Sequence, residues 1–316
     1  MIIYFRGSHP GICGFWYMRK IIYLTAFLLL TFCILTNSSM SLSLAAKGLQ
    51  LWFQNMIPAL LPFMILSGTL IRMGLTEGFT TLVYPFVKPV FRVSRNVCYV
   101  MIMGFLCGFP MGAKCVGDMY AANKISSREA EFLLAFCNNI GPVYFVSFAL
   151  PVIGCTGLGL PLLGMYGLPL LYGLLLRYTV FKEINISAHN PEVSAEMSFL
   201  PAMDAVIYAA LQSMLMLGGY MILFNLLLLV PALSCPTSLP YLAPIFEITG
   251  GLSILGTKLP IYSLIVLPFG GLSCIAQTYT CIKDTDLSLA AYVRHKLILT
   301  LLTAGYYLLL RFLRLL

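Results

Sequence analysis

Charged side chains are scarce in this chain. Asp, Glu, Lys and Arg together make up 9% of the 316 residues, whereas a soluble domain carries about 25%. So few charges cannot cover the surface of a water-soluble body of this length. The composition therefore excludes a soluble enzyme and predicts a membrane protein.

Motifs of catalysis and metal binding are missing as well. The sequence contains no GxxxxGK[ST] loop, no HExxH and no GxSxG, so we expect no enzyme, no cofactor and no resident metal. Its 10 Cys show no CxxC and no zinc-like spacing, and a free buried Cys behaves as a small apolar residue.

Most of the chain consists of long apolar runs. Apolar types make up 60% of the residues, and the mean hydropathy is +0.92. The runs are continuous, whereas a lipid-facing barrel strand alternates over about ten residues. We therefore expect an all-α, polytopic helical membrane protein, located in the cell membrane. The main runs are 51–71, 97–113, 132–150, 158–176, 202–233, 241–257, 259–282 and 297–316.

The N-terminal region, residues 1–44, is a basic segment followed by a first apolar span. It is either a signal peptide cleaved after Ala45 or an uncleaved anchor, and we favour the anchor. The net charge of +8 comes from Lys and Arg that lie between the apolar runs. Since the positive-inside rule accounts for this pattern, we expect the lipid bilayer and no nucleic acid as a partner.

A polar linker over residues 182–200 divides the rest of the chain into two halves, 45–181 and 201–316. The halves match weakly in three blocks: 63–66 with 220–223, 108–114 with 271–277, and 124–126 with 286–288. These matches suggest an internal repeat.

Charge counting favours an inverted repeat. If 97–124 and 241–282 each enter and leave the membrane on one side, the Lys and Arg divide fourteen to five in favour of the inside, as the positive-inside rule prefers. The two halves are then antiparallel, as in many secondary transporters. The predicted inside set is 6, 19, 20, 72, 88, 92, 95, 114, 124, 128, 177, 182, 311 and 314.

Helix breakers interrupt three apolar runs, at 104–114, 137–142 and 268–277. A proline lacks the N–H that would pair with the carbonyl four residues earlier, so Leu106, Asn138 and Leu264 are each predicted to present a free carbonyl. Such groups are tolerated in a membrane only inside protein or beside a water-filled cavity. Packing kinks are the alternative interpretation, but three breaks favour a solute site. The candidate solute-binding residues are Gly108, Pro110, Gly112, Lys114, Asn138, Asn139, Gly141, Pro142, Gly270, Gly271, Ser273 and Gln277.

Two charged residues have open roles. Lys114 either pairs with Asp118 four residues on or faces an anionic solute. Glu247 has no other charge within ten residues on either side, and a charge at mid-bilayer costs about 2.5–3.5 kcal/mol. It is our candidate for binding a coupling ion, a proton or sodium, unless it is solvated at the interface.

The broken runs carry a resemblance to a known family. Residues 108–114 form a G-x-P-x-G-A-K block, 137–142 form C-N-x-x-G-P, and 269–277 form F-G-G-x-S-x-x-x-Q. A Glu before a Thr-Gly turn, Glu247, also fits. Together the blocks resemble the YlbJ-like sporulation integral membrane proteins, which contain the nucleoside-recognition or Gate domain.

The resemblance covers roughly 45–312 and makes each half a Gate-like repeat. It implies a protein of an endospore-forming bacterium, in the mother-cell or outer forespore membrane, linked to moving dipicolinate toward the forespore. The function it suggests is a secondary transporter of a small organic anion. The alternatives are a carrier of a nucleoside-like solute and a non-transporting scaffold of a sporulation membrane complex. A homo-oligomer is left open.

Overall fold

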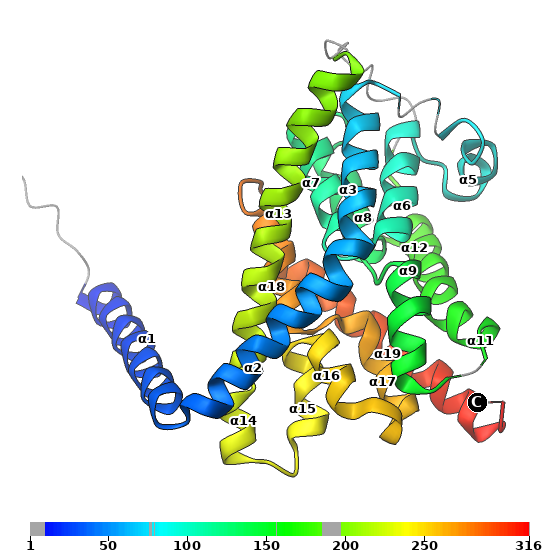
Figure 1. Ribbon diagram of the computed structural model, residues 1–316. Helices are drawn as coiled ribbons and strands as arrows, with labels where there is room; N and C mark the ends of the chain where they lie inside the picture. Colours follow the sequence, from blue (N-terminus) through cyan, green and yellow to red (C-terminus); the bar gives the residue numbers. More distant parts are fainter. Residues whose placement is uncertain (1–9, 76–77, 79, 156, 185–196, 316) are drawn as a thin grey trace, which may run out of the picture.

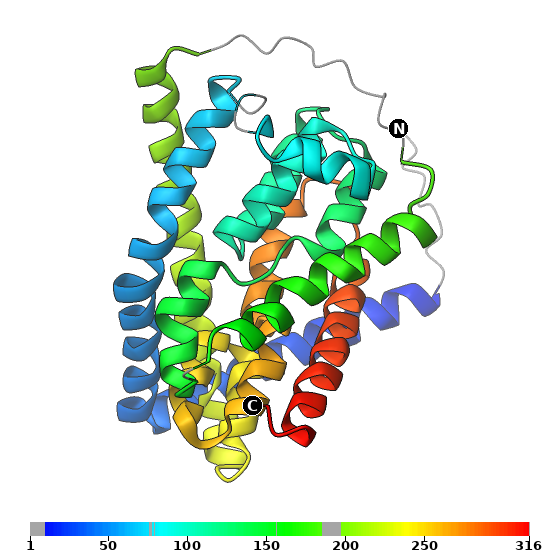
Figure 2. The ribbon, with the colours of Figure 1, turned by 90° about the vertical axis from the view of Figure 1, so that its right-hand side faces the viewer.

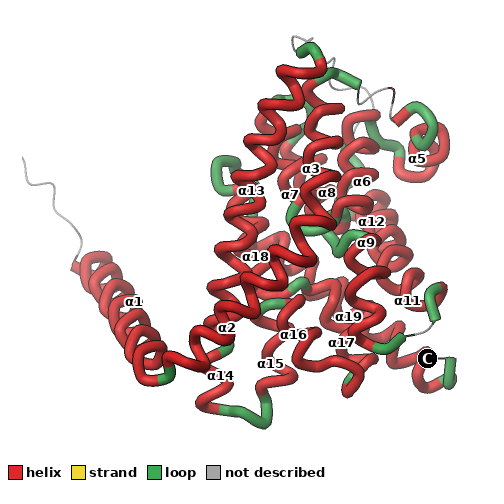
Figure 3. Tube along the Cα trace, in the orientation of Figure 1, coloured by secondary structure: helices red, strands yellow, loops and turns green. Residues whose placement is uncertain are grey.

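The computed structural model describes residues 10–75, 78, 80–155, 157–184 and 197–315. Every regular element within them is a helix (Figure 3). Four helices in this part of the chain are long and apolar enough to cross a membrane, and a fifth is added if the bent pair Tyr84–Phe91 and Arg95–Cys107 forms one span. The expected all-α, polytopic membrane fold is thereby confirmed. The four are Ser38–Leu70, Gly159–Thr179, Phe199–Ser234 and Pro260–Ile282.

The first part of the chain, up to the polar linker, contains short and long helices in alternation. They are α1 (Pro10–Thr36), α2 (Ser38–Leu51), η1 (Trp52–Met56), α3 (Ile57–Arg72), α5 (Tyr84–Phe91), α6 (Arg95–Cys107), α7 (Met111–Ala121), α8 (Ser127–Phe136), α9 (Pro142–Tyr144), η2 (Phe145–Ala149), α10 (Leu150–Ile153), α11 (Gly159–Leu162), η3 (Leu163–Gly167) and α12 (Leu168–Thr179).

The second part begins after the linker, of which residues 185–196 lie outside the described residues. Its elements are α13 (Phe199–Leu227), α14 (Leu229–Ser234), α15 (Leu239–Phe246), α16 (Ile248–Leu255), η4 (Gly256–Lys258), α17 (Pro260–Val266), η5 (Leu267–Phe269), α18 (Gly271–Ile282) and α19 (Leu289–Phe312).

One long helix opens each part, and the two run antiparallel. The elements α2, η1 and α3 follow one another without a gap and lie beside α13 (Figure 2). The Met197 N–H donates to the Arg72 carbonyl at one end, and the Trp52 indole N–H donates to the Met214 carbonyl at 2.9 Å nearer the other. A side chain at Gly48 would collide with the α13 backbone at Met221, so this glycine permits the close approach of the two helices.

A short helical hairpin follows each long helix. In the first hairpin, α6 and α7 pack against each other around residues 108–110. In the second, α15 and α16 pack against each other around Glu247. The first lies toward the end of the molecule where α3 finishes, and the second lies toward α14 at the opposite end (Figure 1).

An interrupted helix and a final helix complete each part. In the first, α8 is separated from α9 by residues 137–141, and α12 comes last. In the second, α17 and α18 are separated by η5 and Gly270, and α19 comes last. The two final helices run antiparallel, because Tyr172 bonds to His295 and the Tyr306 hydroxyl donates to the Leu160 carbonyl.

The same order of elements in both parts, with opposite directions, is what an inverted repeat requires. The repeat itself stays a prediction. One of the sequence matches behind it does not fit this order, because residues 108–114 belong to a hairpin whereas residues 271–277 belong to an interrupted helix.

Two topological expectations are wrong. The segment 241–282 is not one re-entrant unit, because Pro260–Ile282 alone is long enough to span a membrane while α15 and α16 form a hairpin before it. As a consequence α19 runs in the opposite direction to the expected one. Arg311 lines a cavity with Cys155 and Lys258, at the far end of the bundle from Arg177, and Arg314 follows it. Positions 311 and 314 therefore do not belong to the inside set.

Several described members of that set gather at one end of the bundle, here called the basic end. They are Arg72, Arg92, Lys124, Arg128, Arg177 and Lys182. The Asn96 side chain donates to the Lys124 carbonyl, and Arg128 pairs with Glu183 at 2.6 Å. The hydrogen bond from Arg128 lowers the pKa of the exposed Glu183 carboxyl. A capping box formed by Ser126 and Glu129 starts α8 at this end. The positive-inside rule predicts that the basic end faces the cytoplasm.

Arg177 holds the basic end together. Its guanidinium is 5% exposed and donates to carbonyls of two other segments, Phe91 and Arg92 before α6 and Phe181, Lys182 and Ile184 after α12, at 2.7–3.4 Å. Arginine suits this role because it presents five donors in a fixed fork.

We expect Arg177→Met to destabilise the protein by about 3 kcal/mol, because buried carbonyls lose a charged donor. The measurement is thermal unfolding of the purified protein in detergent. Lys182→Met, at an exposed neighbouring position, serves as the control and is expected to change little. Equal melting temperatures for the two variants would contradict this role of Arg177.

Candidate functional site

The interruptions of the helices meet in the interior of the bundle. A side chain at Gly108, in the first hairpin, would collide with the backbone of Ile140 and Gly141 in the interrupted helix α8–α9. Gly270 lies against the Phe109 ring. Gly271 lies against backbone atoms of the second hairpin, and both glycines have positive φ, which favours glycine at these close approaches. The three predicted breaks and Glu247 are thus brought together.

The prolines at these breaks start helices. Pro110 precedes the first residue of α7, Pro142 is the first residue of α9, and Pro268 lies in η5. Proline is well tolerated at a helix start, where its missing N–H would have no partner in any case. Of the carbonyls predicted to be free, that of Asn138 is paired, since it accepts from Lys296.

Asn138 connects three helices through its side chain. Its Oδ1 accepts from the Ala113 N–H of α7 at 3.2 Å. Its Nδ2 donates to Thr278 of α18 at 3.0 Å and to the Tyr292 hydroxyl of α19 at 3.1 Å. Asn138 is 1% exposed, so these bonds also meet the need of a buried amide for partners. Gly112 leaves the space for this contact, because a side chain there would meet Asn138.

Lys296 is a completely buried lysine beside the same break. Its ammonium donates to the Asn138 carbonyl and, at 2.9 Å, to Asn139 Oδ1. The rings of Phe109 and Tyr292 lie 4.5 and 5.6 Å from it, within range of a cation–π interaction. Among the described residues, no carboxylate lies within ion-pair distance of Lys296. Neutral oxygens and aromatic faces therefore stabilise this charge.

Glu247 occupies the tip of the second hairpin and is 2% exposed. Its carboxylate accepts from the backbone N–H groups of Thr249 and Gly250 at 3.0 and 2.6 Å, which caps α16. Asn225 of α13 adds a third donor at 3.1 Å. The solvated alternative for Glu247 is thus wrong, because this carboxylate lies deep in the protein. The Tyr144 hydroxyl, from α9, donates to the Thr249 side chain at 3.2 Å and so joins the first part of the chain to this hairpin.

Gln277 and Ser273 lie one turn apart on α18. The Gln277 amide donates from Nε2 to Ser273 Oγ at 3.0 Å, while its Oε1 atom is buried with no hydrogen-bond partner. Gln277 is 4% exposed. A buried acceptor without a donor costs about 1–3 kcal/mol, so a bound molecule or water that donates to it would be stabilising.

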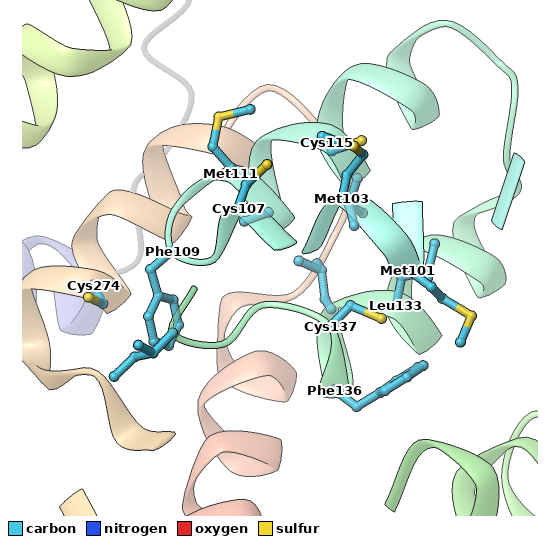
Figure 4. Close-up of a cluster of buried hydrophobic side chains, with 14 of the residues drawn as sticks. Met101, Met103, Cys107, Phe109, Met111, Cys115, Leu133, Phe136, Cys137 and Cys274 are labelled. Carbon is cyan, nitrogen blue, oxygen red and sulfur yellow. The ribbon is translucent and has the colours of Figure 1, made fainter. Parts of the chain in front are cut away.

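A small cavity, here called the inner cavity, lies between the two hairpins. Its volume is about 40 Å³, and Phe109, Gly141, Tyr144, Glu247, Cys274 and Gln277 contribute to its lining. Phe109 and Cys274 both line this cavity, and Figure 4 shows them among buried side chains that include Cys107, Met111 and Cys137. Methionine and cysteine fill such irregular contacts readily, because their sulfur is polarisable.

A larger cavity, here called the vestibule, lies between α7, α13 and α18. Its volume is about 350 Å³, and its charged lining consists of Lys114, Asp118, Lys283 and Asp284. Leu217 and Gln277 line both the vestibule and the inner cavity. Lys114 and Asp118 also line an adjoining cavity that reaches Arg72 at the basic end. The vestibule therefore lies between the basic end and the buried break region.

The pairing interpretation of Lys114 is confirmed, while its role toward an anionic solute stays a prediction. Lys114 pairs with Asp118 at 3.2 Å, as the spacing of four residues predicts, and it also faces the vestibule. All the predicted solute-binding residues lie at or within a few residues of the converging breaks. Lys114, Pro110 and Gln277 line the vestibule, Gly141 and Gln277 line the inner cavity, and Asn138, Asn139 and Ser273 lie in the hydrogen-bond network.

Lys296 and Asn225 were missed by the sequence reasoning. Asn225 is an amide side chain within the long apolar run 202–233. Its isolation among apolar residues is a signal that could have identified it as part of the site. Lys296 adjoins Arg294 and His295 at the edge of the last run, so it looked like a flanking charge. Only the packing of α19 against the break at Asn138 buries it. No group of three or more metal-binding side chains occurs among the described residues.

Comparison with known proteins yields one informative relative. No protein-family profile matches the chain, and no solved structure matches it. The protein named sporulation integral membrane protein YlbJ, from Bacillus subtilis (strain 168), is 29% identical over 306 residues, which cover 83% of this chain and 75% of the relative. Together with the motif blocks and the multi-pass helical fold, this similarity supports the expected resemblance to the YlbJ-like sporulation integral membrane proteins.

Proposed function

We propose that the protein is a secondary transporter of a small organic anion, such as dipicolinate, and acts in endospore formation. The observation that carries the proposal is the convergence of interrupted helices from both parts of the chain on two neighbouring cavities that share lining residues. Discontinuous helices in corresponding positions form the binding sites of many secondary transporters. The relative's role in sporulation supports the cellular setting.

The vestibule is the part of the site that suits a solute. Its volume of about 350 Å³ falls in the range of about 300–1,000 Å³ that small-molecule sites occupy. The start of α7 at Met111 follows Pro110 on its wall, and a helix N-terminus carries partial positive charge. Lys114 and Lys283 add full charges, so carboxylate groups of a solute would find complementary partners there.

Glu247 remains our candidate for the coupling ion. It is a buried carboxylate in a chain without a nucleotide-binding loop, so gradient-driven transport requires an ion-binding group of this kind. The unpaired Gln277 oxygen would accept from an N–H, which keeps a nucleoside-like solute as the competing substrate. A scaffold without transport activity is the remaining alternative, and all three are separated by uptake measurements.

The first test is uptake of labelled dipicolinate by vesicles that contain the purified protein. Lys114→Met is expected to reduce this uptake about tenfold, because the variant removes a cation from the vestibule and leaves Asp118 unpaired. Asp118→Asn is expected to raise uptake at low salt, because it removes a repelling charge. Uptake of a neutral nucleoside should be insensitive to both changes.

Lys258→Met is the matched control, since Lys258 is exposed near the opposite end of the bundle. Absence of uptake for dipicolinate and for nucleosides under both sodium and proton gradients would refute the transporter and favour the scaffold. Uptake of nucleosides without uptake of dipicolinate would show that the solute is nucleoside-like and not an organic anion.

The second test uses a native cysteine of the vestibule. Cys281 lines it and is partly exposed, so an impermeant thiol reagent is expected to modify it from the side of the basic end. Bound solute should slow this reaction by occupying the same space. The readout is the mass of the modified protein, compared with that of Cys281→Ala.

The reaction is carried out on the protein in detergent, where both ends are accessible. Cys235, which is exposed between α14 and α15, is then the internal control, because its modification should not depend on the solute. If solute leaves the Cys281 rate unchanged at concentrations that saturate uptake, the vestibule is not the solute site.

A further inference from the structure

The inner cavity differs from the vestibule in size and in the chemistry of its walls. At about 40 Å³ it exceeds the 10–15 Å³ or so that one water requires, but it is far below the volume of an organic solute. Its polar side chains offer a carboxylate at Glu247, an amide oxygen at Gln277 and hydroxyl oxygens at Tyr144 and Thr249. Oxygen ligands of this kind are those that hard cations prefer.

No ion pair involves Glu247 among the described residues. Three N–H groups donate to its carboxyl oxygens, and the Thr249 side chain also lies beside it. The group is 2% exposed and lines the inner cavity. A buried carboxyl group that is ionised is normally paired or coordinates a metal ion.

Gln277 carries an amide oxygen without a hydrogen-bond partner. Because Nε2 is bound to Ser273 Oγ, the amide is oriented with Oε1 as the atom that has no partner. Gln277 is 4% exposed and lines the inner cavity together with Glu247. The residue with the unpaired oxygen and the buried glutamate thus line the same small space.

We propose that the inner cavity binds a small monovalent inorganic cation, held by the Glu247 carboxylate and Gln277 Oε1. The site deepens the proposed function, because it supplies the ligands of the coupling ion. Gln277 also lines the vestibule. Cation binding would fix its side chain in the wall that the solute contacts, and in this way the cation would favour solute binding.

The test is thermal unfolding of the purified full-length protein in detergent, without any solute. NaCl, LiCl and KCl are each compared with choline chloride at equal ionic strength. A ligand that binds only the folded state raises the melting temperature, and we expect a saturable rise of about 3 °C for at least one alkali cation. The same series on Glu247→Gln and on Gln277→Leu should show no rise.

Asp118→Asn is the matched control, because it removes an exposed carboxylate of the vestibule and should keep the full rise. Gln277→Leu keeps the carboxylate and its capping bonds, so it provides the answer if Glu247→Gln does not fold. Equal melting temperatures of the unaltered protein in alkali and choline salts would overturn the proposal, as would a rise that persists in Gln277→Leu. If the melting temperature depended on pH and on no alkali cation, the ligand would be a proton, and this result would also overturn the proposal.

The outcome is separate from that of the uptake measurements. A cation-dependent rise without any uptake would retain the site and reject the transporter. Uptake that proceeds without dependence on any alkali cation, in a protein with no cation-dependent rise, would retain the transporter and reject the site.

Discussion

The structure depends on one constraint, which is that backbone polar groups inside a membrane need partners within the protein. Interrupting a helix creates such groups, and this chain interrupts its helices at four places that meet. Lys296 satisfies the Asn138 carbonyl, and Glu247 satisfies the N–H groups at the start of α16. The side chains of two buried ionisable residues thus supply partners for backbone groups at the breaks.

The two buried charges lie in different surroundings. Lys296 is enclosed by side-chain and backbone oxygens and by two aromatic rings, whereas Glu247 is bound by N–H donors and borders the inner cavity. Phe109 contacts the lysine and also lines that cavity, so the tip of the first hairpin adjoins both. Movement of this hairpin would therefore affect both charges, and such shared contacts are a physical basis for coupling between sites.

Much of the site could be predicted because its residues are chemically unusual in an apolar chain. Glycine, proline, asparagine and an isolated glutamate stand out within runs of leucine and phenylalanine, and these positions do converge. Lys296 could not be identified in this way, because its neighbours Arg294 and His295 make it resemble a charge at the edge of a span. The pairing of the repeat blocks was not dependable either, since apolar helices match one another easily and 108–114 and 271–277 belong to different kinds of element.

By itself the sequence determined the membrane location, the helical class and the positions of the breaks, because composition and helix chemistry are local properties. The direction of each segment was decided by tertiary structure. Charge counting could not separate the hairpin α15–α16 from the crossing helix Pro260–Ile282, since no Lys or Arg other than Lys258 lies between them. Burial of Lys296, orientation of Gln277 and separation of the two cavities likewise follow from the packing of helices that are distant in the sequence.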